Sequence, residues 1–353
     1  MMIDVCLFVL LLHTTLVTGL ASSYTRAIAV YVDDAPQFAV EAATLYESWR
    51  VVATSHLSID LLLFTHPNVK LDHLPGCKPY THHNFENDCF IVPTELDLEG
   101  MYGVESLNYK YLNSIVFLLV PEAQFVKQYD MLLKTDCDTL VTPAFARWFP
   151  RLAHVGVGHY AGMRETRANL VQWAGKFGVR HRGLMNLGAT WYAEPALLCE
   201  VAHAAAQFSI ELYNNAFPDR NVTMWPRWWY GVSSMYGQEL AVNHLMPEAQ
   251  ATDRIDFPTD RPASINRVYH IHCFQSNKPF SKMAARQGWY TALNTTGWDL
   301  TDVRAYSMEM YLRAIGKSSR DTVIQIWPEH EATVHVNYTD LLHSPPYNNL
   351  YIA

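Results

Sequence analysis

The chain alternates between short apolar runs and longer stretches whose apolar residues recur at helical spacing. The short runs predict buried strands, at residues 26–32, 59–64, 154–161, 186–193 and 268–273 and just before Asp136. The longer stretches predict helices, at residues 38–52, 107–119, 195–212 and 237–244. Residues 66–100 hold several prolines and are predicted to form a loop. This order of elements indicates the α/β class, with a mostly parallel sheet covered by helices on both faces.

Two acidic positions come directly at the ends of predicted strands. Asp33 follows the first strand, and Asp136 ends the run that precedes it. In open α/β sheets, ligands bind at the carboxyl ends of the strands. We therefore expect Asp33 and Asp136 to belong to one binding site.

The N-terminus predicts a signal peptide. The apolar segment from Val5 to Leu20 is short for a membrane span, and small residues suit cleavage after Ala21. Because no Lys or Arg precedes the segment, an uncleaved signal anchor is the alternative, and only then do we expect a membrane partner. We expect a signal peptide at 1–21, one α/β domain at 22–320 and a C-terminal tail at 321–353 that packs on the domain.

Composition and modification motifs agree with a secretory protein. The chain has 353 residues, 17% of them charged, and a net charge of −8 without a Lys/Arg cluster, which argues against a nucleic-acid partner. Sequons occur at Asn221, Asn294 and Asn337. We expect the protein in the lumen of the endoplasmic reticulum or Golgi, or secreted.

Five cysteines remain once Cys6 is removed with the signal peptide, and an odd number cannot all pair. Cys77 and Cys89 flank a loop rich in His, Asn and Pro, and we predict a disulfide between them. The other three cysteines are expected to be free thiols.

The strongest chemical signal is Asp136-Cys137-Asp138. Two carboxylates at i and i+2 of a strand end point the same way, and like charges repel unless something neutralises them. The usual neutraliser is a hard divalent cation with oxygen ligands, whose shell phosphates complete. The pair therefore predicts a metal–nucleotide site; two solvated aspartates at a strand end are the alternative.

A second signal, His270-Ile-His-Cys-Phe-Gln-Ser-Asn-Lys-Pro-Phe280, follows a predicted strand. His270 and His272 share one face of that strand, and a neutral imidazole would complete a metal shell begun by the aspartates. Lys278 would then meet the charge of a diphosphate. The alternative is a hydrogen-bonded core histidine and a solvated lysine.

Taken together, these residues resemble glycogenin-like retaining enzymes, the GT-A nucleotide-sugar glycosyltransferases of glycosyltransferase family 8. That group carries Asp-x-Asp at the end of a central strand and a C-terminal His-x-x-Gly-x-x-Lys-Pro-Trp motif. His272 and Lys278 have this spacing, with Gln275 in place of the Gly. The resemblance implies a GT-A domain, Mn²⁺ or Mg²⁺ held by Asp136, Asp138 and His272, and a donor diphosphate bound by Lys278.

Further stretches resemble the same family in the same order, from the first strand and helix to the helix at 237–244. The resemblance implies that Val32, Asp33 and Phe38 hold the base and ribose. It also implies that Lys110 reaches the sugar phosphate and that Asp136 touches the ribose or sugar. We expect the nucleotide to be UDP.

The catalytic candidates lie in two of these stretches. Asn186 and Gly188, in a strand that resembles the family's Phe-Asn-Ser-Gly-Val, are expected to border the donor sugar. Gln238 takes the family position beneath the anomeric carbon, although Gly237 replaces the Asp before it. Because an amide is a poor nucleophile, front-face attack by the acceptor hydroxyl is favoured over a covalent adduct. Glu239 is a possible base; a solvent-facing helix residue is the alternative.

The resemblance implies transfer of a sugar from a UDP-sugar to a glycan or protein hydroxyl, with retention. One alternative is an inverting enzyme with Glu239 or Glu194 as base. Another is a catalytically inactive secreted sugar- or partner-binding protein, motivated by Gln275 and Gly237. A metallohydrolase is a third, but nothing supplies the extra ligands of a two-metal centre. The aromatic run 225–230 is either an acceptor platform or core, and Arg164 and Arg167 either line the donor or are exposed.

Overall fold

The structure is a computed structural model that describes residues 24–53, 58–82, 85–102, 110–217, 224–273 and 280–318. The predicted signal peptide 1–21 and tail 321–353 lie outside the described residues, as do Gln275, Lys278 and two of the sequons, at Asn221 and Asn337.

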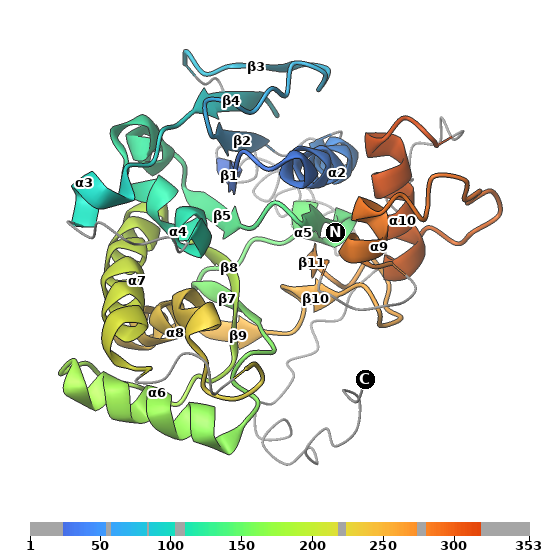
Figure 1. Cartoon of the computed structure of the whole chain (residues 1–353). Helices are drawn as coiled ribbons and strands as arrows, with labels where there is room; N and C mark the ends of the chain where they lie inside the picture. Colours follow the sequence, from blue (N-terminus) through green and yellow to red (C-terminus); the bar gives the residue numbers. More distant parts are fainter. Residues whose placement is uncertain are drawn as a thin grey trace, which may run out of the picture.

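One large sheet forms the centre of the molecule (Figure 1). Its strands, in spatial order, are β3 (Cys77–Pro79), β4 (Cys89–Pro93), β2 (Ile59–Thr65), β1 (Arg26–Val32), β5 (Met131–Thr135), β8 (Leu187–Ala193), β7 (His154–Val157) and β9 (Gln250–Thr252). Neighbours run parallel except at β8, which is antiparallel to both β5 and β7. The predicted α/β class with a mostly parallel sheet is confirmed.

Helices cover both faces of this sheet, so its central strands are buried on both sides. In β1, Ala27, Ala29 and Tyr31 enter one apolar cluster and the alternate residues enter another, as the period of two requires. The first face is covered by α4 (Asn113–Val116), η2 (Phe117–Leu119), η3 (Pro121–Gln128) and α7 (Pro195–Asn215); the second is covered by α2 (Pro36–Ala53) and α5 (Pro143–Ala146).

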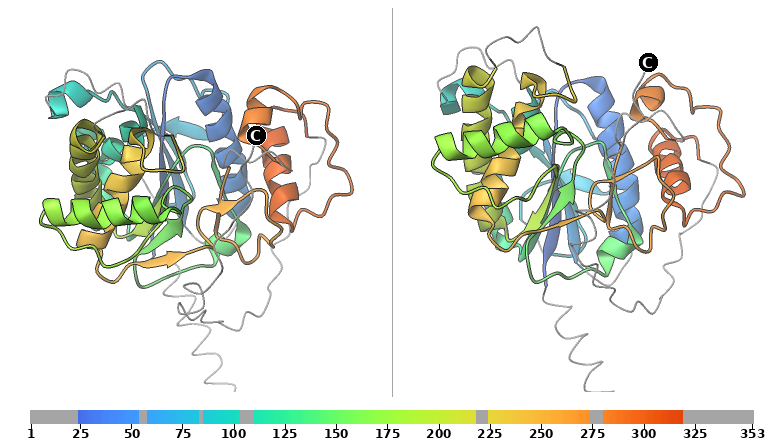
Figure 2. Two further views of the ribbon diagram at one scale, coloured as in Figure 1. Left: turned by 60° about the horizontal axis from the view of Figure 1, so that its bottom comes forward. Right: turned by 90° about the horizontal axis from the view of Figure 1, so that it is seen from below.

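Further helices extend these layers, as the turned views show (Figure 2). Helix α8 (Ser233–Leu245) packs on α7, and α10 (Val303–Ala314) packs on the outer side of α2. The remaining helices are α3 (Leu98–Tyr102), η1 (Lys110–Leu112), α6 (Arg164–Lys176), η4 (Tyr230–Val232) and α9 (Lys282–Arg286). No helix among the described residues combines the length and apolar character needed to cross a membrane.

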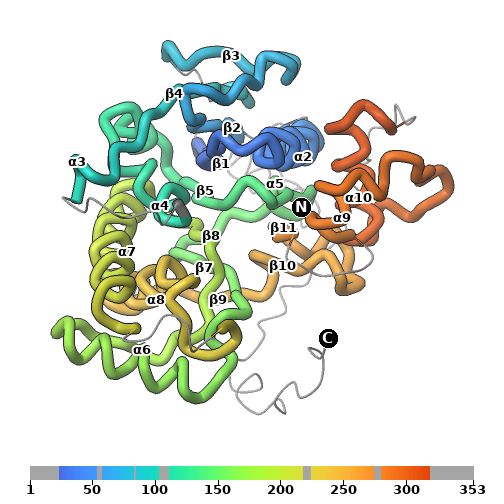
Figure 3. The backbone as a smooth tube through the Cα atoms, viewed as in Figure 1, coloured from blue at the N-terminus to red at the C-terminus, as the bar shows by residue number. Residues whose placement is uncertain are grey.

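A small second sheet connects the C-terminal part of the chain to the end of β5. Its strands are β10 (Phe257–Pro258), β11 (His270–His272) and β6 (Thr139–Val141), in that order. Strand β11 is antiparallel to β6, with His272 opposite Thr139. The tube view shows β10 and β11 in the middle of the molecule (Figure 3). This pairing carries His272 to the segment that follows β5.

Some predicted elements differ from those observed. The predicted loop at 66–100 contains β3, β4 and α3, because the apolar run Cys89–Pro93 pairs with β2 despite its polar flanks. Within the predicted helix 107–119, the described residues from 110 on form a single α-helical turn, α4, between the 3-10 turns η1 and η2. The strand predicted to run to Ala161 ends at Val157.

The predicted disulfide between Cys77 and Cys89 is present and joins facing positions of β3 and β4. Cys137 and Cys273 are free and buried, and Cys199 is free and half-buried, as predicted. A disulfide of this kind is typical of proteins that fold in an oxidising compartment.

Gly237 lies where α8 packs closely on α7. A Cβ atom at this position would meet Ser209 Oγ at 2.1 Å and the carbonyl oxygen of Ala205 at 2.6 Å. A side chain therefore does not fit, and the Asp that the resemblance leads one to expect here would collide with α7. The departure at Gly237 thus has a packing cause and gives no reason to infer a degenerate site.

We expect Gly237→Ala to lower the free energy of unfolding by about 1–3 kcal/mol, because overpacking forces two helices apart. Gly175 in α6 is a matched control, since a Cβ atom there meets open space. Gly175→Ala should be neutral or stabilising by up to about 1 kcal/mol. Urea unfolding of both variants checks this, and equal effects would contradict it.

Candidate active site

The Asp136-Cys137-Asp138 segment forms the turn between β5 and β6. The hydroxyl of Thr139 donates to the carbonyl oxygen of Asp136 at 2.7 Å and holds the turn. The pair lies at the end of the strand, as predicted, but β5 ends at Thr135, so the turn and not the period of two orients the carboxylates. The turn nevertheless brings ligand atoms of Asp136, Asp138 and His272 within 4.8 Å of one another.

This cluster suits a divalent cation in its chemistry and spacing. Nε2 of His272 lies 3.4 Å from Oδ1 of Asp138. Atoms that share one ion at about 2.0–2.2 Å lie about 3–4 Å apart, so small side-chain shifts separate the cluster from coordination. Oδ1 of Asp136 is buried and accepts no hydrogen bond from any described residue. A buried carboxylate oxygen without a hydrogen-bond partner is free to coordinate a cation.

Lys134 supports Asp136 from inside the sheet. It is fully buried in β5, donates to the carbonyl oxygen of Ala189 at 2.9 Å, and lies 3.7 Å from Oδ1 of Asp136. Burial lowers the pKa of Lys134 and raises the pKa of Asp136. This ammonium lies too far from Asp136 for a hydrogen bond, so it offsets part of the local negative charge without occupying the orphaned oxygen.

Asp256 orients the two histidines of β11. Its Oδ1 lies 3.1 Å from Nδ1 of His272, and its backbone amide donates to Nδ1 of His270 at 3.3 Å. His270 also bonds the hydroxyl of Thr135 at 2.9 Å through Nε2, and burial lowers its pKa to about 4. His270 is thus the hydrogen-bonded core histidine of the alternative prediction, whereas His272 turns its Nε2 toward the aspartates.

The Asp256 carboxylate sits in a close-fitting niche. The hydroxyl of Thr190 donates to it at 2.6 Å and the Thr190 amide at 3.1 Å. Gly156 and Gly188 flank it, and a Cβ atom on either would meet Oδ2 at about 2 Å. Asp256 is 1% exposed and has a φ of 56°, a region that Asp tolerates better than most residues. Sequence reasoning missed Asp256, because no motif surrounds it.

The two carboxylate neighbours of His272 determine its pKa. Burial alone would lower the pKa of His272, but Asp138 and Asp256 raise it to about 10. Burial would likewise raise the pKa of Asp138, yet Lys282 and His272 hold it well below its usual range. A ligand nitrogen must be unprotonated, so cation binding through Nε2 of His272 is coupled to release of one proton.

Helix α9 brings further cations to the cluster. Lys282 forms an ion pair with Oδ2 of Asp138, and Arg286 pairs with Glu41 of α2 at 2.7 Å. Glu41 also accepts a weak hydrogen bond from the thiol of Cys137 at 3.5 Å. Burial raises the pKa of Glu41 to about 7. The sequence pattern pointed to Lys278, which lies outside the described residues, and gave no sign of Lys282.

The residues predicted to hold the nucleotide lie at the carboxyl edge of β1, beside β5. Val32 is buried at the end of β1, and the side-chain amide of Asn113 donates to Oδ2 of Asp33 at 3.1 Å. Phe38 is half-buried at the start of α2, with the Arg286 guanidinium 5.8 Å from its ring centre. Lys110 begins η1, and its side chain is not among those described. Since β1 and β5 are parallel neighbours, Asp33 and Asp136 lie at the same sheet edge.

Asn186 and Gly188 lie at the start of β8 and serve its packing. Asn186 has a φ of 59°, accepts from the Ala161 amide at 2.9 Å, and donates to the carbonyl oxygen of Gly158. The space above the Gly188 Cα is taken by the Asp256 carboxylate. The Asp256 carboxylate therefore closes this side of Gly188 to a sugar.

Gln238 and Glu239 are both buried in α8. Oε1 of Gln238 bonds no described residue, and the side chain is 2% exposed. Oε2 of Glu239 accepts from the Tyr160 hydroxyl at 2.8 Å and from the Leu187 amide at 3.0 Å. The prediction of a solvent-facing Glu239 is wrong, because α8 is enclosed by α7, β8 and Tyr160.

A family model described as a domain of unknown function, DUF7164, matches residues 21–338. The chain belongs to this family. No curated protein matches it.

Three solved structures similar to the DUF7164 chain are those of glycosyltransferases. The galactosyltransferase LgtC, in complex with donor and acceptor sugar analogs, is 12% identical, with 84% of this chain and 97% of that chain covered and a TM-score of 0.42. The bifunctional WbbM is 11% identical, with 84% of this chain and 52% of that chain covered and a TM-score of 0.44. Mouse xyloside xylosyltransferase 1 is 11% identical, with 72% of this chain and 99% of that chain covered and a TM-score of 0.40. Similarities this weak assign no activity to the chain.

One residue of the aromatic run of the DUF7164 chain is core, and the others are half-buried or exposed. Trp228 is 8% exposed and stacks on Tyr236 of α8 with ring centres 4.3 Å apart, and Trp225 and Tyr230 pack against the same cluster. Arg164 and Arg167 are exposed on α6.

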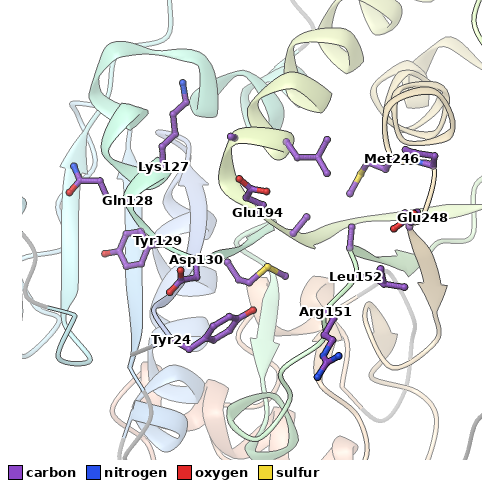
Figure 4. Close-up of a pocket in the computed structure, with 17 residues that line it drawn as sticks. Tyr24, Lys127, Gln128, Tyr129, Asp130, Arg151, Leu152, Glu194, Met246 and Glu248 are labelled. Carbon is purple, nitrogen blue, oxygen red and sulfur yellow. The ribbon is translucent and has the colours of Figure 1, made fainter. Parts of the chain in front are cut away.

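A hollow of about 720 Å³ lies at the other end of the central strands, where β5 begins (Figure 4). It is lined by residues at the start of β5 and the end of β8, among them Asp130, Met131 and Glu194. Because β8 is antiparallel to β5, Glu194 lies at the far end from Asp136. The alternative of Glu194 as a base at the Asp136 edge is therefore wrong.

Proposed function

We propose that this protein is a metal-dependent glycosyltransferase that moves a sugar from a nucleotide diphosphate, with UDP favoured, to a glycan or protein hydroxyl. The observation that carries the proposal is the cluster of Asp136, Asp138 and His272. It lies at the carboxyl edge of a mostly parallel sheet, where α/β folds bind ligands. The family resemblance of the sequence supports the same reaction and a GT-A domain.

Asp136, Asp138 and His272 would hold the cation, Mn²⁺ in preference to Mg²⁺ because one ligand is an imidazole nitrogen. When bound, such a cation acts as a Lewis acid on the departing diphosphate. Asp256 keeps His272 in the tautomer that presents Nε2 to the site. The orphaned oxygen of Asp136 supports the fit.

For the donor, Val32, Asp33 and Phe38 would contact the base and ribose, and Lys278 the diphosphate. Asn186 would border the sugar, and Gln238, with one unpaired buried oxygen, would face the anomeric carbon. We infer front-face attack with retention, because an amide is a poor nucleophile. In the inverting alternative Glu239 would act through Oε1, which bonds no described residue, because Oε2 is already bonded by Tyr160 and Leu187.

A screen of nucleotide sugars with Mn²⁺, read as release of UDP, tests the proposal. We expect metal-dependent hydrolysis of at least one UDP-sugar, and a rise in melting temperature when Mn²⁺ and UDP are added together. With an acceptor identified, NMR of the product should show the anomeric configuration of the donor. Absence of both hydrolysis and thermal stabilisation across all donors would contradict the proposal; an inverted product would contradict retention alone.

We further propose that the enzyme acts in the secretory lumen. The Cys77–Cys89 disulfide and the predicted signal peptide support this location. Glycosidase treatment of the protein expressed in eukaryotic cells should lower its apparent mass, since Asn294 is an exposed sequon. An unchanged mass would contradict passage through the lumen.

A further inference from the structure

Lys282 occupies part of the site that the cation would need. Its ammonium forms an ion pair with Oδ2 of Asp138, while Oδ1 of the same carboxylate faces His272 at 3.4 Å. The Lys282 side chain is 17% exposed, so the pair is largely shielded from water. Asp138 thus has a basic side chain at each oxygen.

The position of Lys282 is built into the fold. Ser281 is buried at the start of α9 and its amide donates to the Tyr290 hydroxyl at 3.0 Å, and Tyr311 of α10 donates to the carbonyl oxygen of Ala285 at 3.0 Å. Arg286 fastens the end of the same helix to Glu41 of α2. Because α9 is held at both ends and by its neighbour α10, only the flexible stem of Lys282 is able to move.

A divalent cation and an ammonium compete for Asp138, since two positive charges at ion-pair distance repel strongly in a shielded site. An ammonium released from Asp138 stays beside the cluster, tethered to α9. A nucleotide diphosphate bound to the cation would place phosphate oxygens within that region, and lysine is a common phosphate ligand.

We propose that Lys282 exchanges partners: it neutralises Asp138 in the free protein and binds a phosphate oxygen of the donor once the cation has taken Asp138. This proposal rests on the proposed function and deepens it. It makes metal and nucleotide binding mutually favourable, because the ammonium displaced by the first ligand recognises the second.

The test uses Lys282→Met, which keeps the stem and removes the charge, on the full mature protein. Mn²⁺ alone is titrated by electron paramagnetic resonance, and UDP is then titrated by calorimetry at saturating Mn²⁺. We expect the variant to bind Mn²⁺ roughly tenfold more tightly, since a competing charge is gone. We expect it to bind UDP roughly tenfold more weakly, since a charge-assisted phosphate contact is lost. The two changes have opposite signs, which a general loss of structure would not produce.

Lys127→Met is the matched control, because Lys127 lies at the opposite sheet edge and bonds only Gln124 among the described contacts. It should change neither affinity. Lys282→Arg retains the charge and should bind Mn²⁺ with nearly the affinity of the natural protein, which keeps the test meaningful if Lys282→Met folds poorly.

Unchanged or weaker Mn²⁺ binding by Lys282→Met overturns the competition with the cation. Tighter Mn²⁺ binding with unchanged UDP affinity overturns the transfer to phosphate. If the natural protein binds neither Mn²⁺ nor UDP, the proposed function fails. In that case, Mn²⁺ binding by Lys282→Met alone would still support competition at Asp138, and binding by neither protein would overturn both proposals.

Discussion

Asp138→Asn is expected to abolish Mn²⁺ binding and to lower metal-dependent turnover of a nucleotide sugar by about 10³-fold or more, since the charge stabilising the leaving group is lost with the cation. Asn keeps the shape of the side chain but removes the negative charge that pairs with Lys282 and His272. Lys282 would then lack its counter-charge and His272 would keep only Asp256, so the cluster would attract a cation less strongly. Mn²⁺ titration and steady-state kinetics measure the two effects.

The same substitution should cost stability, about 1–3 kcal/mol, because the largely buried Lys282 loses its ion-pair partner and His272 loses one of two. A circular dichroism spectrum and a thermal melt therefore accompany the titration. Asp72→Asn, on the exposed stretch after β2, is the control for one lost negative charge and should leave binding and melting unchanged. Retention of Mn²⁺ affinity by folded Asp138→Asn would show that the cation, if any, binds elsewhere.

The cluster of Asp136, Asp138 and His272 could be predicted from the sequence because each residue lies beside a run with a clear period. Asp136 follows an apolar strand, and His272 stands at i+2 from His270 on another. Strand ends meet at one edge of a parallel sheet, so periodicity and topology together bring these residues near each other. The exact turn at residues 136–138 was not predictable, because it depends on β6 pairing with β11.

Residues placed by tertiary contacts left no such signal. Asp256 lies between β9 and β10, where nothing in the local sequence marks it as the partner of His272. Lys282 reaches Asp138 only because α9 is fixed against α2 and α10. The sequence around Glu239 fitted a base or a surface residue, and only the packing of Tyr160 against α8 shows that it is buried with its Oε2 already bonded.

Asp256→Asn is expected to weaken Mn²⁺ binding by about 10- to 100-fold while leaving the fold intact, the range seen when a carboxylate behind a metal-bound histidine is removed. Asn tolerates the positive φ of this position, so the backbone need not change. It lacks the charge that holds Nδ1–H of His272 and favours Nε2 as a ligand. Asp256 is thus a positioning residue, and the KM for metal should change more than kcat at saturating metal.

Gly188→Ala offers an independent route to the same effect. The new methyl group would collide with Oδ2 of Asp256, at 1.9 Å, and force the carboxylate away from His272. If Asp256 acts by orienting His272, this substitution should weaken Mn²⁺ binding without touching any ligand. It should also add little to the loss already caused by Asp256→Asn, because both changes act on one contact. Additive losses in the double variant would instead mean that Gly188 and Asp256 affect the site separately, with Gly188 acting through its backbone near the sugar.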